Sequence, residues 1–364
     1  MNVLVVNAGS SSLKLSLLDE RDATIASKEL ATEGPPDPDA LRAALAGKLG
    51  EADAVGHRIV HGGARFREAV RIDAEVERAL RELVDLAPLH QRKSLDALDA
   101  VTAALPGVPA VACFDTAFHT TLPPAAATYA LPAEWRERWG LRRYGFHGLS
   151  HAWVGRRAPE LLGVDGEGLR IVSCHLGAGA SLCAIESGRS RDTTMGFTPL
   201  EGLVMATRSG SVDPGLVLWL LEHEQLTVEQ LADALEHRSG LLALAGSAEM
   251  RAIIERALSG EQLAETALDV YIHRLRAGIA AMAASLGGLD ALVFTGGVGE
   301  HAPEVRARTA AGLGFLGVAL EEERNRRTSA DGEITAAEAT LRTLVLSARE
   351  DLEIARQVRS LLER

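Results

Sequence analysis

The stretch LVVNAGSSSLKLSLL, residues 4–18, consists of an apolar run, a turn of small polar residues and a second apolar run. A similar stretch, IVSCHLGAGASLCAI, occupies residues 171–185. Each pattern predicts two strands joined by a turn whose glycines and serines let backbone N–H groups approach a ligand closely. The repetition favours a duplicated fold in which each half contributes one such hairpin to a shared cleft. Two unrelated tight hairpins would give the same pattern.

Around these hairpins, short apolar runs alternate with longer helical patterns, which is typical of α/β architecture. The strand-like runs cover residues 3–6, 54–60, 108–114, 170–174, 291–295 and 341–346. Helices are expected over residues 75–87, after a capping box of Thr227 and Gln230, from about residue 265 to 286, and over the apolar stripe at the carboxyl end.

Length, charge and cysteine content narrow the class of protein. At about 150 residues per domain, 364 residues predict two domains. The formal charge of −12 argues against a binder of nucleic acid or of an anionic membrane surface, because the long-range field repels polyanions. Three scattered cysteines predict neither a disulfide framework nor a four-ligand zinc site. With no leader pattern and no apolar window of about 18 residues, we expect a cytoplasmic protein.

The segment NAGSSSLK, residues 7–14, places hydrogen-bond donors on one turn, namely Asn7, Ser10, Ser12 and Lys14. Such donors suit phosphate oxygens, and the lysine adds a point positive charge. The segment is not a Walker loop, because GxxxxGK[ST] occurs nowhere in the chain. A solvated, serine-rich hairpin turn is the alternative.

Arginines and carboxylates also stand in suggestive places. Arg58 and Arg208 each lie among glycines and other small residues, where a guanidinium can meet an oxyanion with two hydrogen bonds. Asp115 and Glu350 each follow a strand-like run, and magnesium takes one or two such oxygens together with water and phosphate. Taken singly, each of these residues is more often an ordinary surface, loop or cap residue.

Two further motifs predict chemistry less clearly. His147 and His151 have the spacing of a zinc-binding helix, but Gly148 stands where zincins have glutamate, so zinc is excluded. FTGGVGEHA, residues 294–302, follows a strand and loosely matches a dinucleotide-binding turn, with acidic residues at 321–323. On that interpretation the protein would be a dinucleotide-dependent oxidoreductase, which leaves NAGSSSLK and both arginines unexplained.

Taken together, these segments resemble the acetate kinase family of the acetate and sugar kinase, heat-shock protein and actin superfamily. Eight stretches match in family order along essentially the whole chain: LVVNAGSSSLK (4–14), GHRIVHGG (56–63), LAPLH (86–90), FDTAFH (114–119), RYGFHGLSH (143–151), SCHLGAGASL (173–182), TTMGFTPLEGLVMATRSG (193–210) and FTGGVGE (294–300).

The resemblance implies an α/β fold of two duplicated actin-like (ribonuclease H-like) domains around a central nucleotide and substrate cleft. The first domain is expected over residues 1–119 with the carboxyl-terminal helix 351–364, and the second over residues 120–350. The implied activity is direct, reversible, in-line transfer of the ATP γ-phosphoryl group to acetate, which gives acetyl phosphate and ADP. It uses Mg²⁺ or Mn²⁺, in what the family leads us to expect to be a homodimer.

The resemblance also implies roles for individual residues. Arg58, Asp115, His147 and Arg208 are the expected catalytic residues, and Asn7 and Glu350 the expected metal ligands. The acetate pocket is expected from Arg58, Val60, Leu89, Phe146 and Pro199. The expected nucleotide residues are Ser10, Ser12, Lys14, His175, Gly177, Gly179, Glu249, Arg251, Gly296, Gly297 and Gly299.

Departures from the family pattern gather on the nucleotide side. Ala178 replaces the asparagine of HLGNG, Glu249 replaces aspartate, and Arg349 stands where the family has asparagine before Glu350. The segment between Lys14 and His57 is also short. Alternatives within the fold are therefore a propionate or other short-chain acyl kinase, a pyrophosphate-dependent variant, and a non-catalytic sensor.

Overall fold

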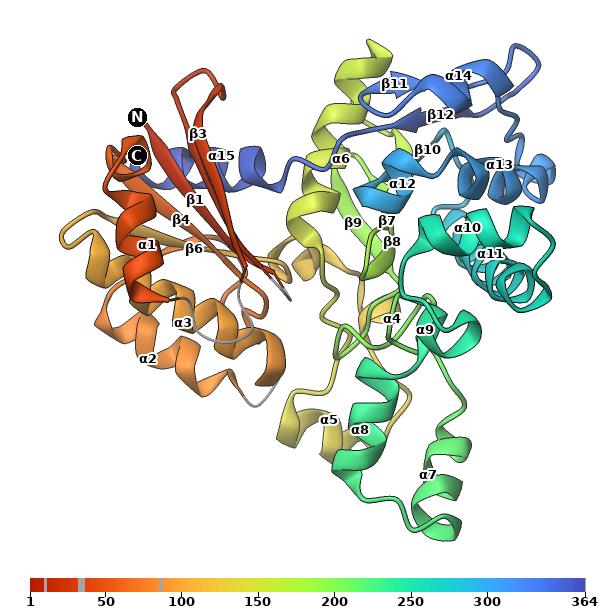
Figure 1. The fold of residues 1–364 in the computed structure, drawn as a ribbon, viewed down its shortest axis with the longest axis horizontal. Helices are drawn as coiled ribbons and strands as arrows, with labels where there is room; N and C mark the ends of the chain where they lie inside the picture. The colour runs from red at the N-terminus through yellow and green to blue at the C-terminus, as the bar shows by residue number, and fades with distance from the viewer. Residues whose placement is uncertain (10–11, 32–36, 85–87, 364) are drawn as a thin grey trace. The chain divides into compact units, whose positions relative to one another are not determined.

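A computed structural model describes residues 1–9, 12–31, 37–84 and 88–363, which form two compact units (Figure 1). Unit 1 comprises residues 1–120, 146–153 and 349–364, and unit 2 comprises residues 121–145 and 154–348. Helix α6, Gly148–Leu162, begins in unit 1 and ends in unit 2. The sequence placed residues 146–153 in the second domain, whereas here they group with unit 1.

Unit 1 is built on a six-stranded mixed sheet with the order β3-β2-β1-β4-β6-β5. Its strands are β1 (Val3–Ala8), β2 (Ser12–Leu18), β3 (Thr24–Ala31), β4 (Ala54–Ile59), β5 (Val70–Arg71) and β6 (Ala110–Phe114). Its helices are α1 (Pro38–Leu45), α2 (Ala74–Glu82), α3 (Pro88–Ala104) and α15 (Glu350–Leu362). Strands β1, β4 and β6 are parallel neighbours, so their carboxyl ends lie at one edge of the sheet.

Alternation along the strands divides the core of unit 1 into two faces. Val3 and Val5 of β1 pack with Ile354 of α15, whereas Leu4 and Val6 pack with residues of α1 and α3. Gly56 in β4 is required here because a Cβ would lie 2.5 Å from the side chain of Ile354. The returning carboxyl-terminal helix therefore completes one face of the first sheet.

Unit 2 contains a second six-stranded sheet with the order β11-β12-β10-β7-β8-β9. Its strands are β7 (Arg170–Leu176), β8 (Ala180–Glu186), β9 (Arg189–Thr193), β10 (Ala291–Thr295), β11 (Gly332–Glu333) and β12 (Arg342–Val345). Its helices besides most of α6 are α4 (Pro124–Ala127), α5 (Ala133–Trp139), α7 (Pro214–His223), α8 (Val228–His237), α9 (Gly240–Ala245), α10 (Met250–Leu258), α11 (Gln262–Ser285), α12 (Gly296–His301), α13 (Pro303–Ala311) and α14 (Glu322–Arg327).

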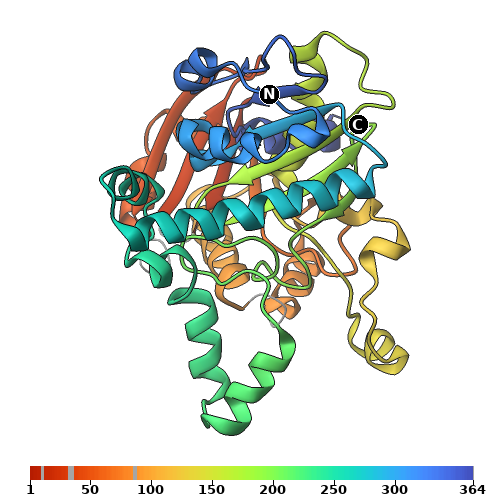
Figure 2. The ribbon, with the colours of Figure 1, turned by 90° about the vertical axis from the view of Figure 1, so that its right-hand side faces the viewer.

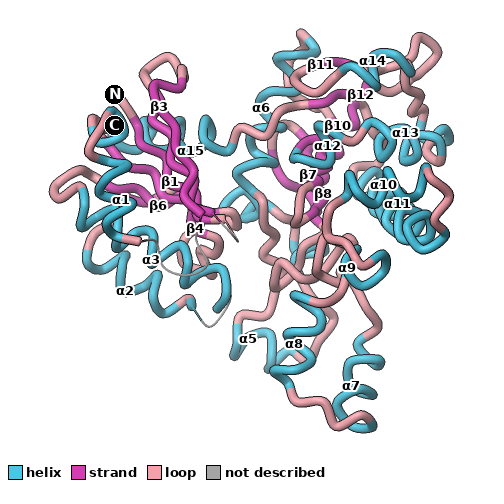
Figure 3. The backbone as a smooth tube through the Cα atoms, viewed as in Figure 1, coloured by secondary structure: helices cyan, strands magenta, loops and turns pink. Residues whose placement is uncertain are grey.

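The two sheets have the same topology, because β7, β8, β9, β10, β12 and β11 follow the order of β1, β2, β3, β4, β6 and β5. In both, an antiparallel three-stranded meander is followed by two parallel strands and one antiparallel edge strand. Figure 3 shows both sheets in magenta with helices beside them. The sequence similarity of residues 4–18 and 171–185 therefore reflects a duplicated α/β fold, and the predicted fold class is confirmed.

Most predicted elements are present within a few residues of their expected limits. The capping box of Thr227 and Gln230 opens α8, and the long helix expected near residues 265–286 is α11. The helix predicted over residues 75–87 is shorter in the structure, because α2 ends at Glu82. A separate helix, α3, begins at Pro88. The described parts of the chain contain no helix with the length and apolarity needed to cross a bilayer.

Candidate active site

Three polar side chains lie together where parallel strands of unit 1 end. Asn7 is near the end of β1, Arg58 near the end of β4, and Asp115 directly follows β6. Since β4 lies between β1 and β6, and since all three side chains share the face covered by α15, the fold brings them into contact. Arg58 is separated in the chain from Asn7 by 51 positions and from Asp115 by 57 positions, yet the three residues form one cluster.

Arg58 and Asp115 form a bidentate ion pair. Arg58 Nε donates to Asp115 Oδ1 at 3.0 Å, and Nη2 donates to Oδ2 at 2.6 Å. The Asp115 side chain is only 1% exposed and that of Arg58 is 15% exposed. Burial lowers the pKa of Arg58, but the carboxylates of Asp115 and Glu350 outweigh it, so the pKa of Arg58 lies above its usual range. Arg58 is therefore a fixed cation at every physiological pH.

The cluster continues from Arg58 to the start of helix α15. Arg58 Nη1 donates to Asn7 Oδ1 at 3.1 Å, and Asn7 Nδ2 donates to Glu350 Oε2 at 3.0 Å. Glu350 is the first residue of α15, where the helix dipole favours a negative charge. Asp115, Arg58, Asn7 and Glu350 thus form one hydrogen-bonded chain, which we call the arginine network.

Arg58 keeps donor capacity beyond this network. A guanidinium carries five N–H donors, and the described residues take three of them, one each on Nε, Nη1 and Nη2. The two further donors lie on the two terminal nitrogens, which is the arrangement that holds an oxyanion with paired hydrogen bonds. The arginine network therefore orients a cation for an anionic ligand while Asp115 keeps it in place.

His147 has an unusual backbone next to the arginine network. Its φ is +55°, in the left-handed region that residues with a side chain rarely adopt. The next residue, Gly148, donates its N–H to the backbone oxygen of Asp115 at 2.9 Å. A Cβ at Gly148 would lie 2.1 Å from that same oxygen, so only glycine fits. Strain of this kind is retained mainly at functional sites, which agrees with the role expected for His147.

The apolar residues expected around the substrate are partly described. Val60 and Phe146 are both buried in unit 1. The ring of Phe146 meets His61 edge to face at 5.5 Å, and its backbone oxygen lies 2.9 Å from Nε2 of the buried His119. Leu89 belongs to α3, but its side chain lies outside the described part of the structure.

The first hairpin turn is described only in part, since Ser10 lies outside the described residues. Lys14 is directly opposite Asn7 in the β1–β2 register. Ser12 Oγ donates to Glu29 Oε1 at 2.6 Å, and Lys14 Nζ lies 4.0 Å from the same oxygen. Among the described residues, Lys14 therefore forms only a solvent-exposed ion pair with Glu29 of β3.

In unit 2, Arg208 and Pro199 lie together. Arg208 Nη1 donates to the backbone oxygen of Pro199 at 3.2 Å, and Arg208 Nε lies 3.8 Å from Glu236 Oε2. Gly240 packs against the backbone of this loop, because a Cβ there would lie 2.2 Å from Met205 O and 2.7 Å from Arg208 O. The loop is also joined to the second hairpin turn, because Ala206 N–H donates to Ala178 O at 3.0 Å.

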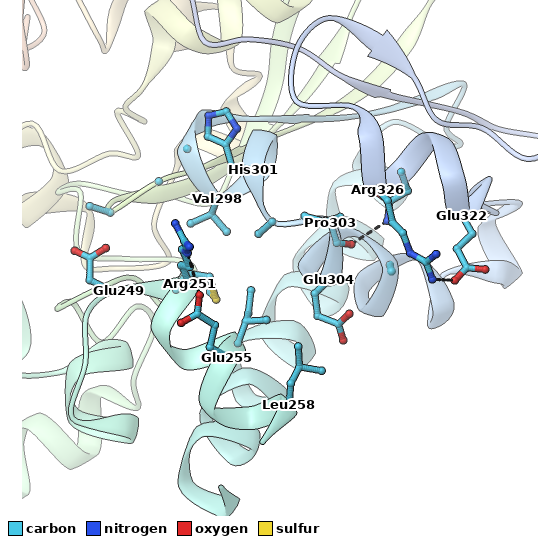
Figure 4. Close-up of a pocket in the computed structure, with 18 residues that line it drawn as sticks. Glu249, Arg251, Glu255, Leu258, Val298, His301, Pro303, Glu304, Glu322 and Arg326 are labelled. Carbon is cyan, nitrogen blue, oxygen red and sulfur yellow. Dashed lines mark hydrogen bonds and ion pairs between the residues drawn. The ribbon is translucent and has the colours of Figure 1, made fainter. Parts of the chain in front are cut away.

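A cavity of about 790 Å³ opens within unit 2 (Figure 4). Four residues expected to bind nucleotide line it, namely Gly177, Glu249, Arg251 and Gly297. Its remaining lining comes from Ala178, Met250, Ile254, Glu255, Leu258, Val298, His301, Ala302, Pro303, Glu304, Ala307, Glu322, Asn325 and Arg326. The walls combine apolar side chains with four glutamates and two arginines, which is the mixture expected around a ligand with an apolar and a polar part.

The other expected nucleotide residues shape the backbone around this cavity. Gly296 has a φ of +78°, and a Cβ there would lie 2.8 Å from Leu176 O. At Gly299 a Cβ would lie 3.3 Å from the backbone of Phe294. Gly179 accepts a 2.9 Å hydrogen bond from Gly177 N–H, and His175 precedes that turn at the end of β7. None of these four residues lines the cavity itself.

Several lining residues were not predicted from the sequence. Met250, Ile254 and Leu258 recur every four residues along α10 and form one apolar wall, so the helical period was a usable signal. Glu322, Asn325 and Arg326 come from α14, whose sequence is a charged helix like many surface helices. Glu321, one of the acidic residues noted with the dinucleotide-binding alternative, caps α14 by accepting from two backbone N–H groups.

His57, next to Arg58 in β4, provides a pH-dependent prediction. It is 1% exposed, and neither ring nitrogen has a hydrogen-bond partner within the described residues. Burial lowers the pKa of His57 to about 3. As the pH falls, the His57 imidazole takes up a proton in the unfolded chain before it does so in the folded protein. The contribution of neutral His57 to the free energy of unfolding is therefore fully present above about pH 6.5 and is lost as the pH falls towards 3.

We expect His57→Leu to remove this acid sensitivity. Wild type should lose about 2 kcal/mol of unfolding free energy between pH 7 and pH 5 through this one group, and the variant should keep it. Urea unfolding at both pH values measures the difference. His237→Gln, an exposed histidine, is the control and should follow wild type. An equal acid loss in His57→Leu and wild type would contradict the prediction.

The model of the acetokinase family matches residues 39–356. An acetate kinase of Trichormus variabilis is 49% identical over 319 residues, which cover 87% of this chain and 78% of that protein. An acetate kinase of Thermotoga maritima is 42% identical over 400 aligned positions, covering 100% of this chain and 99% of that protein.

Solved structures agree over nearly the full length. Acetate kinase from Porphyromonas gingivalis has a TM-score of 0.90 at 35% identity, with 99% of each chain covered. A propionate kinase from Francisella tularensis has a TM-score of 0.92 at 32% identity, covering 99% of this chain and 100% of that one. The chain therefore belongs to the acetokinase family, whose members are phosphotransferases with a carboxyl group as acceptor.

Proposed function

We propose that this protein is an acetate kinase that transfers the γ-phosphoryl group of ATP to acetate, reversibly, giving acetyl phosphate and ADP. The observation that carries the proposal is the bidentate Arg58–Asp115 pair, which leaves two donors of a fixed cation for an anionic ligand. Relatives named acetate kinase, similar over most of both chains, support acetate as the acceptor.

The residue types agree with the chemistry of this reaction. A carboxylate oxygen of acetate attacks the γ-phosphorus, and the bond from that phosphorus to the bridging oxygen breaks with its electrons left on ADP. No proton has to move, so no strong base is needed. The difficulty is the approach of two anions, which cations and hydrogen-bond donors relieve. We assign this task to Arg58, Arg208 and His147.

We further assign the apolar and nucleotide contacts. Val60, Leu89, Phe146 and Pro199 are proposed to hold the methyl group of acetate. The cavity of unit 2 is proposed to hold ATP, because the expected nucleotide residues Gly177, Glu249, Arg251 and Gly297 line it. We assign Ser10, Ser12, Lys14, His175, Gly179, Gly296 and Gly299 to the phosphates or to the loops that position them.

The arginine network is also compatible with a magnesium ion that arrives with the nucleotide. Within the described residues no three His, Cys, Asp or Glu side chains form a ready-made metal cluster. Mg²⁺, however, needs only one or two carboxylates besides phosphate and water. Glu350 uses one oxygen for Asn7, which leaves Oε1 as a ligand candidate. When bound, the ion supplies positive charge to the phosphate oxygens, and Asn7 keeps Glu350 oriented.

A hydroxamate assay for acyl phosphate tests the proposal. Purified protein is incubated with ATP, Mg²⁺ and acetate, propionate or butyrate, and ATP is then replaced by pyrophosphate. We expect turnover with ATP and acetate at a rate ordinary for a kinase, about 1–100 per second. No acyl phosphate from any of the three acids would overturn the proposal, and turnover with pyrophosphate alone would reassign the donor.

Propionate kinase is a second candidate, supported by the similarity to the Francisella tularensis structure. One methylene group in an apolar pocket changes binding by only about 1–3 kcal/mol, so related enzymes can differ in acyl preference. A higher kcat/KM for propionate than for acetate in the same assay would favour this assignment.

We also propose that the protein forms a homodimer through α7. All of its residues are at least partly exposed, although its sequence, PGLVLWLLEH, is mostly apolar. Leu216 is 48% exposed, Leu218 59% and Trp219 46%. Helix α5 also exposes apolar residues, Trp135 and Trp139. Figure 2 shows α5 and α7 extending from the same end of unit 2. Exposed apolar surface of this extent is typical of an interface between protein chains.

Charge on α7 should therefore dissociate the dimer. We expect Trp219→Asp to weaken association by at least about 2 kcal/mol, roughly 30-fold in the dissociation constant, because buried tryptophans dominate such interfaces. Light scattering after size-exclusion chromatography measures the mass over a concentration series. Leu263→Asp, at an exposed leucine of α11, is the control. A monomeric wild type, or a Trp219→Asp variant that dimerises equally well, would contradict the proposal.

A further inference from the structure

Arg306 of helix α13 is a fully buried cation next to the cavity of unit 2. Its exposed fraction is 0%, and no carboxylate within the described residues forms an ion pair with it. Burial lowers the pKa of Arg306 to about 10, which still leaves it charged at neutral pH. Placing an ion in such surroundings costs several kcal/mol unless hydrogen bonds compensate. The arrangement around Arg306 therefore needs a reason.

Every N–H donor of this guanidinium has an acceptor. Nε donates to Asn325 Oδ1 at 2.8 Å. Nη1 donates to the backbone oxygens of Gly299 at 2.8 Å and Glu300 at 2.7 Å. Nη2 donates to the backbone oxygens of Asn325 and of Thr328, the latter at 3.1 Å. Five donors and five acceptors match, which a lysine with three donors cannot reproduce.

These acceptors belong to two walls of the cavity. Gly299 and Glu300 lie in the last turn of helix α12, from which Gly297, Val298 and His301 line the cavity (Figure 4). Asn325 lies in α14, together with the lining residues Glu322 and Arg326. Arg306 itself does not line the cavity. It therefore fixes the distance between two walls without occupying the space between them.

Asn325 extends the connection to a third wall. Its Oδ1 accepts from Arg306, and its Nδ2 donates to the backbone oxygen of Pro303 at 2.9 Å. Pro303 opens α13 and lines the cavity. A single buried side chain and one amide thus hold α12, α13 and α14 in register.

We propose that Arg306 is a positioning residue that pre-organises the nucleotide cavity by tying its three helical walls together. The inference rests on the proposed function, in which this cavity holds ATP or ADP. Because the walls of a preformed cavity are already ordered, less free energy is lost in ordering them when the nucleotide binds. Nucleotide affinity is therefore the property that Arg306 controls. Neither acetate binding nor the chemical step depends on it directly.

Steady-state kinetics and nucleotide-induced thermal shifts test this role in the full-length protein. We expect Arg306→Lys, which keeps the charge but loses the planar fork, to raise the KM for ATP about 10-fold. Arg306→Met should raise it further. The KM for acetate should stay at the wild-type value and kcat should stay within about threefold. The increase in melting temperature produced by ADP should shrink in parallel with the lost affinity.

A matched control separates positioning from general stability. Arg276 also donates to backbone oxygens near the end of a helix, those of Arg308 and Thr309, but neither it nor these two residues line the cavity. Arg276→Lys should lower the melting temperature of the free protein and leave the KM for ATP unchanged. If Arg306→Lys behaves in the same way, Arg306 is merely structural and the proposal is overturned.

Insoluble Arg306 variants and an inactive wild type would each have a separate meaning. If Arg306→Met does not give soluble protein, Arg306→Gln takes its place beside Arg306→Lys, because Asn325 itself lines the cavity and is left intact; an unchanged KM for ATP in both variants overturns the proposal. If wild type neither makes acyl phosphate nor is stabilised by ADP, the proposed function fails first. Wild type that is active, with an Arg306→Lys variant of unchanged KM for ATP, contradicts only the role of Arg306.

Discussion

Replacing Arg58 by alanine is expected to lower kcat for acetyl phosphate formation by about 10²–10³, the usual effect of removing one donor that stabilises transition-state charge. The reason is that Arg58 has donors left over after binding Asp115 and Asn7, and these are the groups proposed to hold the anions together. The hydroxamate assay at saturating ATP and acetate measures the change. Near-normal turnover in purified, folded Arg58→Ala would contradict the assignment.

The same substitution has a cost in stability that can be separated from catalysis. Burial already raises the pKa of Asp115, and loss of its Arg58 partner raises it further. A carboxyl whose folded pKa lies above its unfolded value destabilises the protein increasingly as the pH rises. Breaking a buried pair in this way costs about 3–5 kcal/mol. Arg58→Ala should therefore lie closer to wild type in melting temperature at pH 5 than at pH 8.

A double variant and an unrelated arginine complete the test. Arg58→Ala combined with Asp115→Asn removes the unpaired charge, so it should regain stability while remaining inactive. Arg359→Ala is the matched control, because Arg359 is 14% exposed and ion-paired with Asp22 in the same unit. We expect Arg359→Ala to lower stability and to leave kcat unchanged. A double variant that regained turnover would show that Asp115, not Arg58, limits the reaction.

The strand pattern and the short motifs predicted the scaffold of this site, because both are local in sequence. The stretches of residues 4–18 and 171–185 each form the expected pair of antiparallel strands, and Asp115 follows a strand as expected. What could not be predicted is that Asp115 binds Arg58 directly. That contact depends on which strands are neighbours, and strand order is set by packing across the whole sheet.

The walls of the nucleotide cavity were harder to predict for a related reason. Arg306 lies in PEVRARTAA, a helix in which charged residues alternate with uncharged ones, and nothing in this sequence indicates that one arginine is buried. Arg308, two positions later, is partly exposed and ion-paired with Glu304 and Glu265. Only the packing of α12 and α14 around α13 distinguishes these two arginines. Buried polar networks of this kind are specified by tertiary structure, not by local propensity.

Arg208→Ala is the second substitution for which we expect a loss of about 10²–10³ in kcat. In contrast to the Arg58–Asp115 pair, Arg208 Nε lies 3.8 Å from Glu236 Oε2, and the Glu236 side chain is 20% exposed whereas that of Asp115 is 1% exposed. Removal of Arg208 therefore leaves Glu236 partly hydrated, whereas removal of Arg58 leaves Asp115 buried. The loss of activity should come with a smaller loss of stability than in Arg58→Ala, as thermal unfolding at pH 8 will measure.

Two further variants show whether the charge of Arg208 or the geometry of its guanidinium determines kcat. Arg208→Lys keeps the charge but loses the planar fork, so kcat should remain well below wild type if two hydrogen bonds to one oxyanion are required. Glu236→Gln removes the distant ion pair and should leave kcat unchanged. Lysine restoring full turnover would reduce Arg208 to a point charge. Near-normal turnover in Arg208→Ala would remove it from the reaction, and the carboxylate and phosphoryl groups would then depend on Arg58 and His147.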